Sequence, residues 1–143
     1  MKTFNTSRDI KATIDEVFAA ISNPERLARW WGPAGFTNTF SLCEFSKGGR
    51  WSLIMHGPDG SHYPNENTFA EVESPGKVVV QHTSEPKFRL TIALAASPTG
   101  TTVSWSQEFE SSEVADRIEH IVVPANDQNL ERLSAEVLRQ AAP

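Results

Sequence analysis

Between residues 37 and 109 the chain alternates strand-like runs with short breaks that contain glycine or proline. The predicted strands cover 37–45, 50–56, 62–73, 77–83, 88–95 and 101–109. Each break supplies the residues that tight turns require. Spacers this short favour hairpins, because a parallel crossover needs about a dozen residues or more. With a first strand over 2–11, the sequence predicts an antiparallel sheet of about six to seven strands.

One face of the last two predicted strands is apolar, which indicates a sheet that is covered on one side only. The residues on that face are Phe88, Leu90, Ile92, Leu94, Val103, Trp105, Gln107 and Phe109. The predicted cover is a long C-terminal helix that opens at Pro124, with 111–122 leading into it as at most a short helical turn. Its inward stripe contains Asn126, Leu130, Leu133 and Val137. Its charged side chains are expected largely elsewhere: Glu131, Arg132, Glu136 and Arg139.

Two short helices are predicted between the first strand and the rest of the sheet. Thr13 and Glu16 form a capping box in front of an amphipathic helix over 14–22. Asn23 can cap a second helix in which Pro24 suits the first position and Leu27, Trp30 and Trp31 share one face. Gly32 and Pro33 end it. Helices segregated from an antiparallel sheet define an α+β fold, expected as a single domain over residues 1–143.

Charge and composition exclude several kinds of partner. The formal net charge is -5 and Lys and Arg are not clustered, which argues against nucleic acid and against anionic membrane surfaces. No apolar run approaches the length needed to span a bilayer, and no signal peptide is expected. Cys43 is the only cysteine, expected as a small strand residue that is at least half-buried, and no intrachain disulfide can form. A cytoplasmic location is the expectation.

Several sequence motifs resemble the START/SRPBCC superfamily, and within it the bacterial single-domain relatives of the C-terminal domain of the heat-shock-protein ATPase activator (Aha-type proteins). They are Asn-Pro-Glu-x-Leu-x-x-Trp-Trp-Gly-Pro at 23–33, the hairpin at 48–60, the segment at 63–78 and Asn-Leu-x-Arg-Leu at 129–133. The likeness covers essentially the whole chain. It implies a helix-grip fold, in which a curved antiparallel sheet wraps around the C-terminal helix and leaves an apolar cavity. The motifs are specific for fold rather than activity, because the superfamily includes lipid carriers, cyclases and hormone receptors.

We therefore predict that the protein binds a small apolar or amphipathic molecule between the sheet and the terminal helix. Aromatic residues and Met would supply the apolar wall, and polar side chains on the otherwise apolar strand and helix faces would orient the ligand's polar end. The candidate residues are Trp31, Trp51, Met55, Tyr63, Phe69, His82, Trp105, Gln107 and Asn126. The alternative is that the aromatic residues fill a solid core and the polar ones pair with backbone or water.

The sequence also leaves other functions open. A cyclase or hydrolase could use His82 or Tyr63 as an acid–base group, but no spacing assigns a catalytic residue. The four histidines lack metal-ligand spacing, so no metal and no cofactor are expected. A chaperone-associated module is a third hypothesis, and we expect no retention by the bacterial heat-shock ATPase in a pull-down. An exposed sheet edge could pair two copies as a homodimer.

Overall fold

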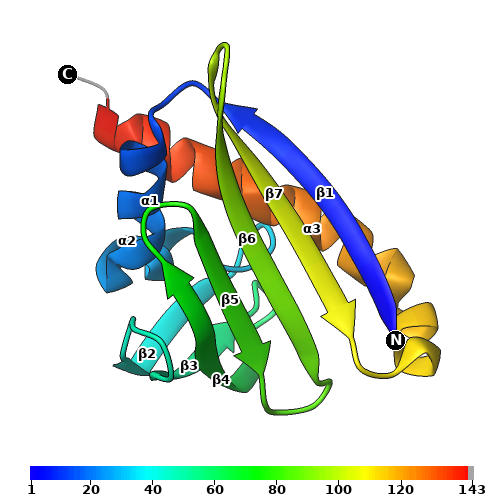
Figure 1. Ribbon diagram of the computed structural model, residues 1–143. Helices are drawn as coiled ribbons and strands as arrows, with labels where there is room; N and C mark the ends of the chain where they lie inside the picture. The colour runs from blue at the N-terminus through cyan, green and yellow to red at the C-terminus, as the bar shows by residue number, and fades with distance from the viewer. Residues whose placement is uncertain (142–143) are drawn as a thin grey trace.

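The computed structural model describes residues 1–141 and confirms the α+β helix-grip architecture (Figure 1). Seven strands form one antiparallel sheet in the order β1-β7-β6-β5-β4-β3-β2. They are β1 (Lys2–Ile10), β2 (Thr37–Cys43), β3 (Arg50–His56), β4 (His62–Glu73), β5 (Lys77–His82), β6 (Phe88–Ser97) and β7 (Gly100–Phe109). The helices are α1 (Ile14–Ser22), α2 (Pro24–Trp30) and α3 (Ser112–Ala141).

The long helix α3 lies across one face of the curved sheet. In Figure 1 it runs behind β1, β7 and β6, from beside the N-terminus to the region of α1 and α2. No helix within residues 1–141 is long and apolar enough to cross a bilayer. The arrangement leaves α3 and the concave face of the sheet as two opposed layers.

Both short helices begin at the predicted caps. Thr13 Oγ1 accepts a hydrogen bond from the Glu16 N–H at 3.1 Å, and Glu16 Oε1 accepts one from the Thr13 N–H at 2.9 Å. Asn23 Oδ1 accepts from the Glu25 N–H at 3.0 Å, with Pro24 in the first helical position. These bonds satisfy N–H groups that have no partner inside a helix.

The start of the terminal helix was predicted wrongly. α3 begins at Ser112, twelve residues before Pro124, and Pro124 lies inside it. A proline there cannot donate to the carbonyl of His120 one turn earlier. Both residues are exposed, so water can hydrate that carbonyl, and the helix continues through the proline.

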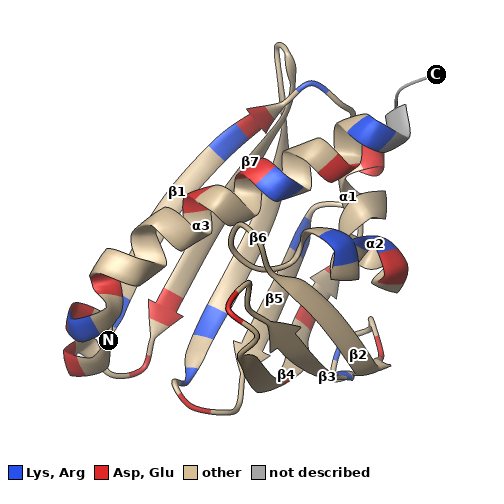
Figure 2. Cartoon of the chain, turned by 180° about the vertical axis from the view of Figure 1, so that it is seen from behind, with Lys and Arg blue, Asp and Glu red and all other residues tan. Residues whose placement is uncertain are grey.

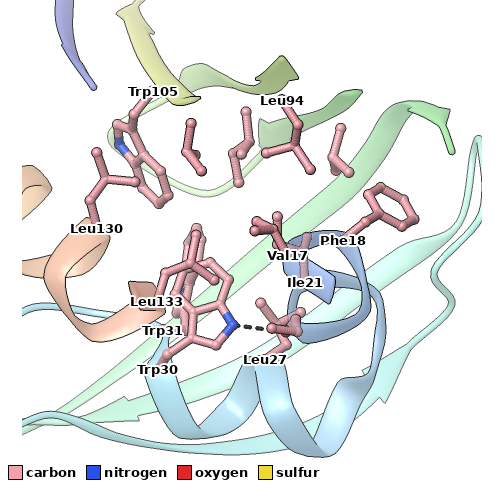
Figure 3. Packing of buried hydrophobic residues seen from close by; sticks show 14 of the residues in the cluster. Val17, Phe18, Ile21, Leu27, Trp30, Trp31, Leu94, Trp105, Leu130 and Leu133 are labelled. Carbon is pink, nitrogen blue, oxygen red and sulfur yellow. Dashed lines mark hydrogen bonds between the residues drawn. The ribbon is translucent and has the colours of Figure 1, made fainter. Parts of the chain in front are cut away.

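The core contains a cluster of four tryptophans from different elements. The ring centroids of Trp30 and Trp31 lie 5.7 Å apart, and that of Trp31 lies 4.8 Å from Trp51 and 5.8 Å from Trp105. Trp30 donates from Nε1 to the Ala20 carbonyl oxygen at 2.9 Å, the dashed line in Figure 3. Helix α2, the segment after it, β3 and β7 are thus joined through aromatic rings, beside Leu130 and Leu133 of α3 in Figure 3.

Candidate functional site

A cavity of about 430 Å³ lies between the concave face of the sheet and the first half of α3. Its walls come from β3 to β7, the segment that follows α2, and one face of α3. This volume is within the range of about 300–1,000 Å³ that is typical of small-molecule sites. The two layers are therefore not packed flush along their whole length.

The register of the sheet explains which strand residues face the cavity. Asn67, His82 and Phe88 are direct neighbours on β4, β5 and β6. In the adjacent row of the sheet, Leu90 on β6 lies opposite Gln107 on β7. These two rows line the cavity, so aromatic, aliphatic and amide groups alternate on its floor.

The opposite wall is a short, charge-free stretch of α3. Ile121, Val122, Ala125 and Asn126 all line the cavity. They fall between Glu119 and Asp127, and residues 120–126 of α3 carry no Asp, Glu, Lys or Arg. Figure 2 shows this stretch as an uncharged band between charged positions on either side.

The segment Trp31-Gly32-Pro33 closes one side of the cavity and is held in place from α3. Arg132 Nη1 donates to the carbonyl oxygens of all three residues, at 3.1, 2.9 and 2.9 Å. Its Nη2 donates to two further carbonyl oxygens, those of Arg29 and Phe36, both at 2.9 Å. Burial lowers the pKa of Arg132 from its ordinary value. One guanidinium thus satisfies five carbonyl groups around the end of α2.

Gly32 is required at the centre of this segment. Its φ is 99°, a conformation that side chains other than glycine rarely adopt. A Cβ atom there would lie 3.0 Å from Met55 Cε, which is itself in the cavity wall. Asn129 supports the same turn by accepting from the Gly32 N–H at 3.3 Å and donating to the Trp30 carbonyl oxygen at 3.3 Å.

His82 is the buried titratable group of the cavity. Burial lowers its pKa below the ordinary value, although the hydrogen bond to the Pro86 carbonyl favours the charged form. Nδ1 lies 2.8 Å from that carbonyl oxygen, to which it can donate. Nε2 lies 2.6 Å from Asn65 Oδ1, which is also an acceptor, and the ring stacks on Phe88 with the two centroids 4.4 Å apart. Burial favours the uncharged ring, whereas the two acceptor oxygens favour the protonated one.

Gln107 and Asn126 connect the two walls. Asn126 Nδ2 donates to Gln107 Oε1 at 3.0 Å, and the two residues are only 8–9% exposed. Gln107 Nε2 and Asn126 Oδ1 make no hydrogen bond within residues 1–141, yet neither is among the buried polar atoms left without a partner. Both atoms are therefore accessible to solvent, and because both side chains line the cavity, we infer that the two atoms face it.

Seven of the nine predicted site residues line the cavity: Trp31, Met55, Tyr63, His82, Trp105, Gln107 and Asn126. Trp51 and Phe69 do not. They are each 1% exposed, and their rings stack at 5.5 Å in the aromatic core. The alternation of a strand gives the face on which a side chain lies, but not how deep in the core that position falls.

The prediction omitted several wall residues: Asn67, Phe88, Leu90, Ile121, Val122, Ala125 and Asn129. The register between β4 and β5 pairs Asn67 with His82, which a single sequence does not display. Ile121 and Val122 were missed because the predicted helix starts at Pro124, and Ala125 lay inside that helix but not on its predicted inward stripe. Had the apolar spacing of residues 118, 121, 122 and 125 been extended through the proline, it would have placed them.

The remaining reactive side chains lie apart from the cavity floor. The Nδ1 atoms of His56 and His62 are 2.7 Å apart across β3 and β4, with His62 at the cavity mouth. Within residues 1–141 no group of three or more His, Cys, Asp or Glu side chains could hold a metal ion. Burial raises the pKa of Cys43 to about 11, so its thiol is not activated.

The fold and the cavity together define a helix-grip protein. The family described as Activator of Hsp90 ATPase homolog 1-like protein (AHSA1) matches residues 11–137, and the chain belongs to that family. The comparison with curated proteins gave no match.

Solved structures of similar proteins share the fold at low identity. A protein of Arthrobacter aurescens is 24% identical, with a TM-score of 0.87 over 96% of this chain and 86% of its own. A protein of Nitrosomonas europaea is 16% identical, with a TM-score of 0.86 over 96% and 95%. An AHSA1-like protein of Aeromonas hydrophila is 22% identical, with a TM-score of 0.78 over 98% and 94%. Likeness at this level concerns the fold alone.

Proposed function

We propose that the protein binds a small apolar or amphipathic molecule in the cavity between the sheet and α3. The observation that carries the proposal is an open volume of about 430 Å³ beside an otherwise packed core. Its walls are largely aromatic and aliphatic, with a few amide groups and the buried imidazole of His82, a composition typical of small-molecule sites. The proposed ligand contacts are the seven predicted residues that line the cavity, extended by Phe88, Leu90 and Val122.

A pair of neighbouring valines on α3 tests the proposal. Val122 lines the cavity, whereas Val123 is 45% exposed and does not. A tryptophan at position 122 would occupy the ligand's volume, while the same residue at 123 would point into water. The probe is N-phenyl-1-naphthylamine, an uncharged dye that fluoresces in apolar surroundings.

We expect the wild-type protein and Val123→Trp to bind one dye molecule with similar affinity. Val122→Trp should bind at least about tenfold more weakly, since the apolar area available to the dye is lost. Far-UV circular dichroism would establish that both variants fold. Equal binding by the two variants, or no binding by the wild-type protein, would contradict the proposal.

An acid–base enzyme is a second candidate, because His82 and Tyr63 line the same cavity. Burial favours the uncharged imidazole of His82, which is the form a general base requires. Hydrolysis of p-nitrophenyl acetate should then fall on His82→Gln and be unaffected by His120→Gln, an exposed control. A wild-type rate no higher than that of His82→Gln would dismiss this candidate.

A further inference from the structure

The cavity wall is almost free of charge. No Lys or Arg is among the described residues that line it, and Glu85 at its edge is the only Asp or Glu. Burial lowers the pKa of His82, which favours its uncharged form. His62 lies at the mouth and is exposed to water. A ligand with an ionised carboxylate would have no buried cation to pair with.

The guanidinium of Arg132, which lies against the cavity-lining segment at residues 31–33, is already engaged. Arg132 uses its Nη1 and Nη2 atoms on five backbone carbonyls of residues 29–36. Moving it toward a bound anion would leave those carbonyls without a donor. The wall of α3 itself adds no cation, since residues 120–126 are uncharged.

Two polar side chains of the wall form a matched amide pair across the cavity. Asn126 donates one hydrogen bond to Gln107, with 3.0 Å between Nδ2 and Oε1. Gln107 Nε2 is left as a donor and Asn126 Oδ1 as an acceptor. If both side-chain amides are turned by 180°, donor and acceptor change places. One N–H group and one carbonyl oxygen still remain free for a ligand.

We propose that the ligand is electrically neutral and carries an oxygen-bearing group, of the carboxamide or alcohol kind, that pairs with Gln107 and Asn126 while its apolar skeleton lies against the aromatic walls. The inference rests on the proposed function and narrows it to uncharged compounds. Fatty acid anions and other carboxylates are then poor ligands. Burying an ion without a partner costs far more than burying a neutral group that is hydrogen-bonded.

Three probes with one skeleton separate charge from polarity: naphthalene, naphthalene-2-carboxamide and naphthalene-2-carboxylate. The amide and the carboxylate have nearly the same shape and differ in charge at pH 7.5. The cavity volume equals that of about 14 water molecules in the liquid, enough for two fused rings and a small substituent. Affinity is measured by isothermal titration calorimetry, and the indole N–H resonances of Trp31 and Trp105 report the place of binding.

We expect the carboxamide to bind at least about tenfold more tightly than the carboxylate and more tightly than naphthalene. Gln107→Leu and Asn126→Leu should each remove the preference for the carboxamide over naphthalene. Gln81→Leu is the matched control, because Gln81 alternates with Val80 and His82 and lies on the other face of the sheet. Thermal unfolding of each variant would show that it is folded.

Each result has a distinct meaning. If the carboxylate binds as tightly as the carboxamide, or naphthalene does, the inference is wrong while the cavity remains a binding site. If Gln107→Leu and Gln81→Leu have the same effect, the amide pair is not the recognition element. If none of the three probes binds up to its solubility limit, the proposed function fails and the inference fails with it.

Discussion

At the scale of single residues, one side chain of α3 does the work of a helix C-cap. The last carbonyls of a helix have no partner within it and need donors from elsewhere. At the end of α2, Arg132 donates to the carbonyl oxygens of Arg29 and Trp31. Those of Ala28 and Trp30 accept from the side chains of Asn38 and Asn129. A planar guanidinium suits the task because it offers five N–H groups in a fixed fork.

Arg132→Lys tests this role. An ammonium keeps the charge but has three donors, so carbonyls around Gly32 lose their partners. We expect a loss of about 2 kcal/mol in the free energy of unfolding, measured by urea denaturation. Arg117→Lys, at an exposed position of the same helix, should change it by less than about 0.5 kcal/mol. A similar effect of both substitutions would show that the five contacts contribute little.

The same residues show why some contacts can be predicted from sequence and others cannot. The caps at Thr13 and Asn23 were predicted because donor and acceptor lie two or three positions apart. Arg132 was placed merely away from the inward stripe, since nothing local indicates that it reaches the end of another helix. Prediction at this scale succeeds for neighbours in sequence and fails for neighbours in space.

At the scale of elements, α3 is tied to α2 by a buried carboxylate. Glu136 was predicted on the charged face of the helix, but it is only 5% exposed. Its oxygens accept from Arg26 Nε at 2.9 Å and from Arg29 Nε at 3.0 Å. Burial alone would raise its pKa, yet the hydrogen bonds from Arg29, Arg26 and Arg139 lower it from 4.5 to about 2.

Glu136→Gln should therefore change how stability depends on pH. A carboxylate whose pKa is lower in the folded state stabilises the fold above its unfolded pKa and loses that effect as pH falls through the folded one. At pH 7 we expect the variant to be less stable by about 2 kcal/mol. The difference should shrink between about pH 4.5 and pH 2. Glu131→Gln, at an exposed site on the same helix, is the control, and a constant difference across that window would refute the argument.

Pro124 offers a second test of α3. In the interior of a helix a proline removes a backbone hydrogen bond and crowds the preceding turn. Pro124→Ala should thus raise the free energy of unfolding by about 1–2 kcal/mol, after allowance for the greater freedom of the unfolded chain. Thermal denaturation would measure it. If the unfolding midpoint of Pro124→Ala is unchanged or lower, the proline stabilises the folded helix and the argument is wrong.

The same proline explains the misplaced boundary. Proline is common in the first turn of a helix, so Pro124 was interpreted as the start of α3. The strands fared better, because the breaks between successive strands from β2 to β7 contain glycine or proline and join strands that pair with each other. Their observed bounds differ from the predicted ones by at most two residues.

At the scale of the whole molecule, the tryptophan cluster joins the helical layer to both halves of the sheet. Trp30 and Trp31 belong to α2 and its end, Trp51 to β3, and Trp105 to β7. All four are at most 9% exposed. Elements that share so much buried aromatic surface should unfold together.

We expect one cooperative transition. Tryptophan fluorescence, near-UV circular dichroism and far-UV circular dichroism should give coincident urea curves. A fluorescence change that precedes the loss of far-UV signal would show that the helical layer separates from the sheet first. Leu130→Ala, in the core beside Trp105, should shift all three curves together by about 2–5 kcal/mol.

The candidate site was predictable at this scale only in part. Periodicity gave the apolar faces of β6 and β7 and the stripe of α3 from Asn126 onward. The resemblance to the Aha-type family gave the cavity. Neither gave the position where the two layers stop touching, because that depends on the lengths of side chains that meet from distant segments.

Different parts of helix α3 line the cavity and pack in the core, so binding specificity can evolve separately from stability. Ile121, Val122, Ala125 and Asn126 line the cavity. Leu130, Leu133 and Val137, further along the helix, are packed in the hydrophobic core. Substitutions at the cavity-lining positions can change which ligands bind without removing core contacts that stabilise the fold. A directed-evolution library restricted to 121, 122 and 125 would thus explore new specificities on a scaffold that stays intact.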